Sequence, residues 1–174
     1  MLMVHDLINA LGQIPAHWIT LIIATLPIAE LRGAIPWALA SPPVGGGLDW
    51  PTAYVLAVIG NFLPVMPILL LLDPVSGFLR RWRLFDRFFS WLFERTRRKS
   101  RLIEKYEALG LILFVGIPLP ITGAWTGSIA AFIFGIPKRQ AVPCIILGIL
   151  LAGVVVTLAS LGVIGFYGIF KGGA

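Results

Sequence analysis

The sequence predicts an all-α integral membrane protein. We expect an inverted repeat of a re-entrant helical hairpin plus a transmembrane helix, with a cytoplasmic amphipathic helix between the halves. Hydrophobic residues make up 58% of the 174 residues and charged residues 13%, whereas soluble domains are about 45–50% apolar and about 25% charged. The mean hydropathy is +0.92. Proline and glycine interrupt two long uncharged runs, and one segment holds ten of the 14 basic residues.

The first hairpin is expected over residues 14–40, after an amphipathic entry helix over residues 1–12. Its first limb, residues 14–26, is too short to cross a ~30 Å hydrocarbon core as a helix. We assign the break between its limbs to Pro27, Gly33 and Pro36, because proline interrupts helical hydrogen bonding. A proline-glycine loop over residues 41–47 then follows.

Glu30 and Arg32 lie alone within this break, since no other Asp, Glu, Lys or Arg occurs between residues 7 and 48. A charge at bilayer depth costs at least ~2.5–3.5 kcal/mol and usually marks a functional site. We therefore predict that both side chains face a polar cavity. The alternative is a loop at the membrane surface, where both charges are solvated.

A transmembrane helix is predicted over residues 50–72, which contain no charge and are long enough to span. Asn61, Pro64 and Pro67 lie inside it. Two interpretations remain open: a kinked span whose asparagine bonds a neighbouring helix, or the wall of a cavity.

A basic amphipathic segment follows at residues 76–106. Residues 80–105 contain ten basic and three acidic side chains, a net charge of +7. Aromatic and basic residues recur at helical spacing, as in a helix lying at the membrane interface. The segment Arg80–Lys105 either recruits anionic lipid or only anchors the chain against anionic headgroups. Because the basic character belongs to this one segment, we expect no nucleic-acid partner.

The second hairpin is expected over residues 108–137, with its break at Pro118 and Pro120, and the last transmembrane helix over residues 140–170. Placing Gly33 on Gly123, an offset of ninety, aligns the two halves as a repeat of hairpin, loop and span. All of these segments form a single domain, residues 1–174.

The positive-inside rule places the basic segment in the cytoplasm. The first hairpin then enters from outside and the second from inside, so the halves have opposite topology. Paired broken segments in an inverted repeat indicate a site at the bilayer midplane of a secondary transporter.

The chemistry of this site depends on the first break. Arg32 presents a fork of donors that suits phosphate or carboxylate. A low-dielectric site favours protonated Glu30, which would let it carry a proton in ion coupling; the alternative is a static Glu30–Arg32 pair. The second break adds hydroxyl, backbone and ring groups to the predicted substrate-binding set: Thr122, Gly123, Trp125 and Thr126.

Catalysis and metal binding are not expected. Cys144 is the one cysteine, and His5 and His17 share no helical face, so neither a metal site nor a nucleophile–base set is available. We expect no cofactor and no catalytic residue. A homodimer is compatible with so few spans.

The segments Ala29–Pro36 and Pro118–Gly127 resemble the two signature stretches of the family called "putative small multidrug export proteins". The resemblance implies a multi-pass protein of the prokaryotic inner membrane with two opposed re-entrant hairpins. That architecture is similar to the DedA/VTT superfamily, whose members are linked to moving lipids such as polyprenyl phosphates. Acidic and arginine residues near the DedA hairpins are implicated in proton-dependent function, and Glu30 and Arg32 are their counterparts by position. The second hairpin here has no arginine.

Three functions follow as hypotheses. The first is a secondary transporter or flippase for a small amphipathic anion, driven by a proton or sodium gradient. The second is a proton-coupled exporter of cationic drugs that uses Glu30, against which the nearby Arg32 argues. The third is a non-transporting scaffold or passive scramblase of membrane lipids.

Overall fold

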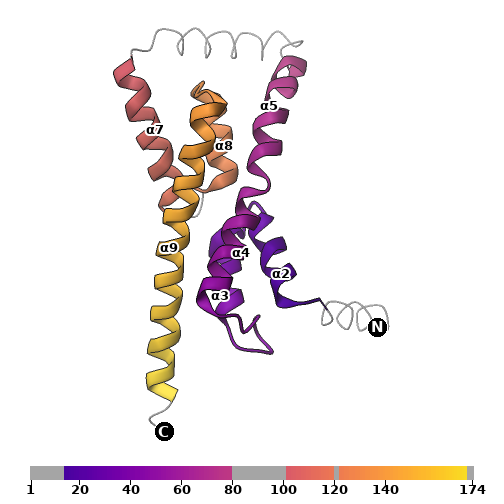
Figure 1. Cartoon of the computed structure of the whole chain (residues 1–174), viewed down its shortest axis with the longest axis vertical. Coiled ribbons are helices and arrows are strands. Elements are labelled where there is room, and N and C mark those ends of the chain that lie inside the picture. Colours follow the sequence, from indigo (N-terminus) through magenta and orange to yellow (C-terminus); the bar gives the residue numbers. More distant parts are fainter. Residues whose placement is uncertain (1–13, 80–100, 120–121, 172–174) are drawn as a thin grey trace. The chain divides into compact units, whose positions relative to one another are not determined.

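The computed structural model describes residues 14–79, 101–119 and 122–171 (Figure 1). Every element within these ranges is an α-helix, as the composition predicts. The helices are α2 (Ala16–Thr25), α3 (Glu30–Leu39), α4 (Trp50–Phe62), α5 (Val65–Leu79), α7 (Arg101–Gly116), α8 (Ala124–Ile133) and α9 (Lys138–Lys171). The predicted entry helix, residues 1–12, and most of the basic segment, residues 76–106, lie outside the described residues.

The chain forms two compact units. Unit 1 comprises Met1–Gly60 and Val156–Ala174, and unit 2 comprises Asn61–Val155. Helices α4 and α9 each contribute to both units.

In unit 1, α2 and α3 pack against each other as a helical hairpin (Figure 1). The buried apolar side chains of these two helices are small or branched: Ala24, Leu31, Ala34, Ile35 and Ala38. Gly60 brings α4 against α2, because a Cβ at this position would lie 2.6 Å from the Leu21 carbonyl oxygen and 2.8 Å from the Ala24 Cβ. Small residues allow such close approach of apolar helices.

The loop after α3 folds back onto the end of that helix. The backbone amides of Gly46 and Leu48 donate hydrogen bonds to the carbonyls of Trp37, at 2.9 Å, and Ala38, at 2.8 Å. These bonds satisfy carbonyls that the end of a helix leaves without intrahelical partners. The predicted loop over residues 41–47 therefore caps α3 before α4 begins.

The predicted single helix over residues 50–72 is two helices. Helix α4 ends at Phe62, a turn occupies Leu63 and Pro64, and α5 runs from Val65 beyond the predicted end to Leu79. The break falls at Pro64 because proline has no backbone N–H to continue the helical hydrogen bonds. By length and composition, the stretch Trp50–Leu72 is still able to cross a membrane.

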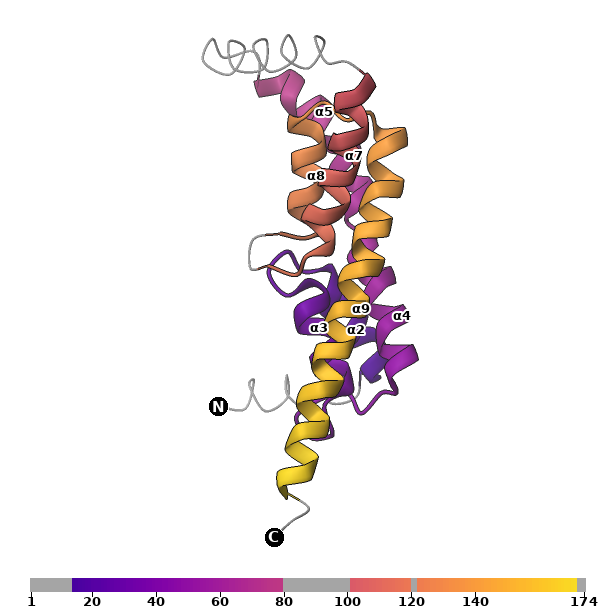
Figure 2. The same cartoon turned by 90° about the vertical axis from the view of Figure 1, so that its left-hand side faces the viewer.

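In unit 2, α8 packs against both α5 and α7 (Figure 2). Val115 on α7 is buried in unit 2 and is 2% exposed. A Cβ at Gly148 would lie 2.6 Å from the Val115 Cβ, and one at Gly127 would collide with the same side chain. Helices α8 and α9 therefore approach α7 through glycines on either side of one valine.

The two units can be compared element by element with the predicted repeat. Each unit contains a helix, a break and a ten-residue helix: α2 and α3 in unit 1, α7 and α8 in unit 2. At an offset of ninety, Gly33, which lies inside α3, falls on Gly123, which precedes α8. The repeat therefore stays a prediction.

Within the described ranges, two stretches are long and apolar enough to cross a membrane, Trp50–Leu72 and Lys138–Ile164. The first has a buried and an exposed stripe. Its buried stripe is Ala53, Ala57, Asn61, Val65 and Leu69, and its exposed stripe is Val55, Ile59, Leu63, Met66 and Leu70. A continuous exposed stripe of large apolar side chains suits contact with lipid better than contact with water.

Candidate functional site

The candidate site begins at the turn between α2 and α3. Helix α2 ends at Thr25, and Leu26 adopts an extended conformation with ψ of 136°. The amide of Glu30 donates a 3.0 Å hydrogen bond to the Leu26 carbonyl and so closes the turn. Pro27 lies in this turn, and Ile28 beside it is 93% exposed.

Glu30 is the first residue of α3 and is buried, with 5% of its surface exposed. Its φ of 44° lies in the left-handed region, which costs a residue with a Cβ roughly 1–2 kcal/mol. Burying a carboxylate carries a further cost unless other groups compensate it. Strained, buried ionisable groups are concentrated at functional sites.

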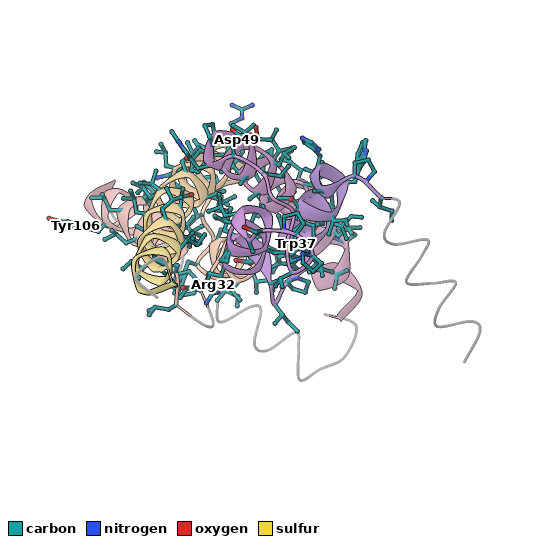
Figure 3. The ribbon with its side chains drawn as sticks, turned by 90° about the horizontal axis from the view of Figure 1, so that it is seen from below. Arg32, Trp37, Asp49 and Tyr106 are labelled. Carbon is teal, nitrogen blue, oxygen red and sulfur yellow. The ribbon has the colours of Figure 1, made fainter. Side chains whose placement is uncertain are left out.

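Arg32 lies two residues further along α3 and is half-buried. Figure 3 shows that Arg32 and Trp37, both on α3, leave the helix in different directions, and that Asp49 at the start of α4 lies apart from Arg32. The first turn of α3 therefore carries both charges predicted for the site. An acidic group at this end also complements the positive end of the helix dipole.

Two residues assigned to the first break belong to the helix instead. Gly33 and Pro36 both lie inside α3, so the break is shorter than predicted and comprises Leu26 to Ala29. A Cβ at Gly33 would lie 2.8 Å from the Ala29 Cβ, so this glycine lets the first turn of α3 pack tightly on the chain before it. Pro36 is exposed, where its ring displaces no packed neighbour, and α3 ends three residues later.

The second break is held by Thr122. Its hydroxyl donates a 2.7 Å hydrogen bond to the Ile117 carbonyl and accepts a 3.1 Å hydrogen bond from the Leu119 amide. The hydroxyl predicted to bind substrate therefore closes the loop after α7. Pro118 lies in this loop, whereas Pro120 lies outside the described residues.

Gly123, Trp125 and Thr126 lie at the start of α8. Gly123 is its N-cap residue, and its carbonyl accepts a 2.8 Å hydrogen bond from the Gly127 amide. The Thr126 hydroxyl donates to the same carbonyl at 3.4 Å. The predicted site residues thus form two sets, Glu30 and Arg32 in unit 1, and Thr122, Gly123, Trp125 and Thr126 in unit 2.

A hydrogen bond between Thr25 and Gly60 was not predicted from the sequence. The Thr25 hydroxyl lies 2.8 Å from the Leu21 carbonyl and 3.1 Å from the Gly60 carbonyl. Pro64, four residues after Gly60, has no N–H for that carbonyl, so Thr25 supplies the missing donor. The four-residue spacing of Gly60 and Pro64 signals the need for a donor, but the sequence does not reveal which side chain provides it.

Asn61 is the one polar residue in the buried stripe of Trp50–Leu72 and is 1% exposed. Within the described part of the chain, its Oδ1 accepts no hydrogen bond. A buried acceptor without a donor costs about 1–3 kcal/mol. The first of the two interpretations of Asn61, a hydrogen bond to a neighbouring helix, is therefore not seen at this oxygen.

Asp49 caps the start of α4. The Thr52 amide donates a 3.3 Å hydrogen bond to the Asp49 Oδ2, as expected of an N-cap residue. Hydrogen bonds from the side chain and the backbone of Thr52 hold the pKa of Asp49 below its ordinary value of 3.8. Asp49 therefore stays ionised at neutral pH.

The described residues contain no group of three or more His, Cys, Asp or Glu side chains that could hold a metal ion.

A family model described as "putative small multi-drug export protein" matches residues 30–155. The match begins at Glu30 and includes Arg32, the second break and more than half of the chain. No curated protein and no solved structure matches the chain.

Proposed function

The chain belongs to the family described as "putative small multi-drug export protein", and from this premise we propose that it is a secondary transporter that moves a small amphipathic anion across the membrane. Family membership and the two long apolar stretches among the described residues support a location in the membrane. The observation that carries the choice of substrate is the first turn of α3, where Glu30 is buried in a left-handed conformation two residues before Arg32.

In this proposal Arg32 binds the anionic group of the substrate. Guanidinium stays charged at every physiological pH and binds phosphate or carboxylate through two parallel hydrogen bonds. A lipid phosphate of the polyprenyl class suits this group, because its long apolar part would remain in the bilayer.

Glu30 couples transport to a gradient in this proposal. In the substrate-free state of this proposal, the positive charge of Arg32 stabilises the Glu30 carboxylate. Substrate anion bound at Arg32 offsets that charge and so favours protonation of Glu30. Uptake of the anion and uptake of a proton would then favour each other. The bound anion shifts the protonation equilibrium of Glu30 only as far as its interaction energies with the protonated and the ionised form differ.

The proposal is tested with the full chain in proteoliposomes, by following a fluorescent short-chain prenyl phosphate across the membrane under an imposed pH gradient. Arg32→Ala should raise KM at least tenfold, because a hydrogen bond to a charged group contributes about 1.5–3 kcal/mol. Glu30→Gln should leave movement of the prenyl phosphate down its own concentration gradient unchanged. The same variant should abolish the response of that movement to the pH gradient. Arg139→Ala is the matched control, since it removes an exposed arginine outside the site.

Export of cationic drugs is the second candidate, and the family description together with the buried carboxylate of Glu30 favours it. The same vesicles distinguish the two. If a lipophilic cation is expelled in exchange for protons while the prenyl phosphate stays where it is, the anion proposal is wrong. If the phosphate moves equally fast with and without any gradient, the protein is a passive scramblase.

A further inference from the structure

We propose a binding site for a sodium ion at the break between α4 and α5, with the side-chain oxygen of Asn61 as one ligand. This site is separate from Glu30 and Arg32. Its existence does not depend on the proposed function, whereas a role for the ion in coupling would rest on it.

The first argument is the side chain of Asn61. It is the penultimate residue of α4, it is 1% exposed, and its Oδ1 accepts no hydrogen bond within the described ranges. Buried polar atoms in native proteins nearly always have a partner. An amide oxygen is an acceptor only, so the missing partner is a donor or a cation.

The second argument is the backbone beside it. Pro64 and Pro67 lie four residues after Gly60 and Leu63, and proline cannot donate the hydrogen bond that a helix would supply to those carbonyls. The Gly60 carbonyl receives the Thr25 hydroxyl instead. The Leu63 carbonyl, in the turn itself, is thus deprived of its helical donor two residues from Asn61.

Oxygen ligands for a cation are available at the end of α4. This helix ends at Phe62, and the last carbonyl groups of a helix have no intrahelical donor. Interrupted membrane helices coordinate sodium through such carbonyls. Sodium suits neutral oxygens, whereas calcium sites are built mainly from carboxylates, and residues 50–72 contain no carboxylate.

The test measures the unfolding temperature of the purified full chain in detergent micelles by tryptophan fluorescence, while sodium chloride replaces choline chloride at constant ionic strength. Sodium at about tenfold above its dissociation constant should raise the midpoint by about 3 °C, and the rise should saturate. Asn61→Ala should abolish the rise. Asn61→Asp keeps an oxygen ligand and adds charge, so half-saturation should move to at least threefold lower sodium.

Ser128→Ala is the matched control. Ser128 is also fully buried and polar, but its hydroxyl already donates to the Ala124 carbonyl at 2.7 Å, so this variant should keep the full response to sodium. If the unmodified protein responds equally to sodium and choline, the site does not exist, whether or not the variants fold. An unchanged sodium response in Asn61→Ala would also overturn the proposal. Neither result bears on whether the protein transports an anion.

Discussion

Glu30 combines burial, charge and a left-handed backbone, and these can be separated by substitution. Glu30→Gly and Glu30→Ala both remove the carboxylate, but only glycine adopts a φ of 44° without cost. The glycine variant should therefore be more stable than the alanine variant, by about 1 kcal/mol, as measured by thermal unfolding in micelles.

At an ordinary position inside a helix, the alanine variant is more stable than the glycine variant, since glycine costs about 1 kcal/mol relative to alanine. Ala38→Gly, in the buried interior of the same helix, supplies that comparison. If the alanine variant at position 30 were the more stable one, Glu30 would have a normal helical conformation, and the argument from strain would fail.

The lowered pKa of Asp49 predicts a loss of protein stability at acid pH. Its pKa is lowered in the folded state, chiefly by the Thr52 side chain and then by the Thr52 amide. The stabilisation it provides is therefore complete above 3.8 and is lost as the pH falls through the lower, folded pKa. Unfolding temperatures of the native chain should decline over this range more steeply than those of Asp49→Asn.

Asparagine is the informative replacement because it caps helices as well as aspartate does and does not titrate. At pH 7 the two proteins should unfold at similar temperatures. Asp49→Ala, which lacks any cap, should be less stable than both at pH 7. Equal acid sensitivity of the aspartate and asparagine proteins would show that Asp49 contributes nothing to the pH dependence.

At the scale of the helices, one hydroxyl contributes a hydrogen bond to the junction of α2 with α4. Thr25→Val keeps the shape of the side chain and removes the donor to the Gly60 carbonyl, which should cost about 1 kcal/mol. Pro64→Ala restores a backbone N–H four residues after Gly60. In the double variant, the Thr25→Val substitution should therefore cost much less, as a double-mutant cycle of unfolding free energies would show.

Additive costs in that cycle would mean that Thr25 and Pro64 act independently. The hydroxyl would then serve only the Leu21 carbonyl, which lies 2.8 Å away in its own helix.

The helices themselves were largely predictable, because apolar runs and prolines define them. The break at Pro27 and the last long helix agree with the sequence pattern. The assignment of Gly33 and Pro36 to the break is wrong because the pattern does not distinguish a glycine that ends a helix from one that lets a helix pack closely. The sequence marks Asn61 as a polar residue in an apolar run, but the state of its oxygen depends on tertiary packing, which no local pattern contains.

At the scale of the whole molecule, membrane topology determines what the site can do. The predicted orientation opens the turn between α2 and α3 to the outside and the loop between α7 and α8 to the cytoplasm. Both carry exposed apolar side chains: Ile28 is 93% exposed and Leu119 is 53% exposed. Exposure alone does not distinguish water from lipid, and the transport proposal requires water at both positions.

Thiol labelling of vesicles tests that requirement most directly. In a Cys144→Ser background, Ile28→Cys should react with a polar reagent from outside only and Leu119→Cys from the cytoplasmic side only. Ile59→Cys, on the exposed apolar stripe of α4, should react from neither side, because its thiol would lie in lipid. If Ile28→Cys is as unreactive as Ile59→Cys, or reacts from the cytoplasmic side, the turn carrying Glu30 and Arg32 is not an outward-facing aqueous site and the proposed transport mechanism is wrong.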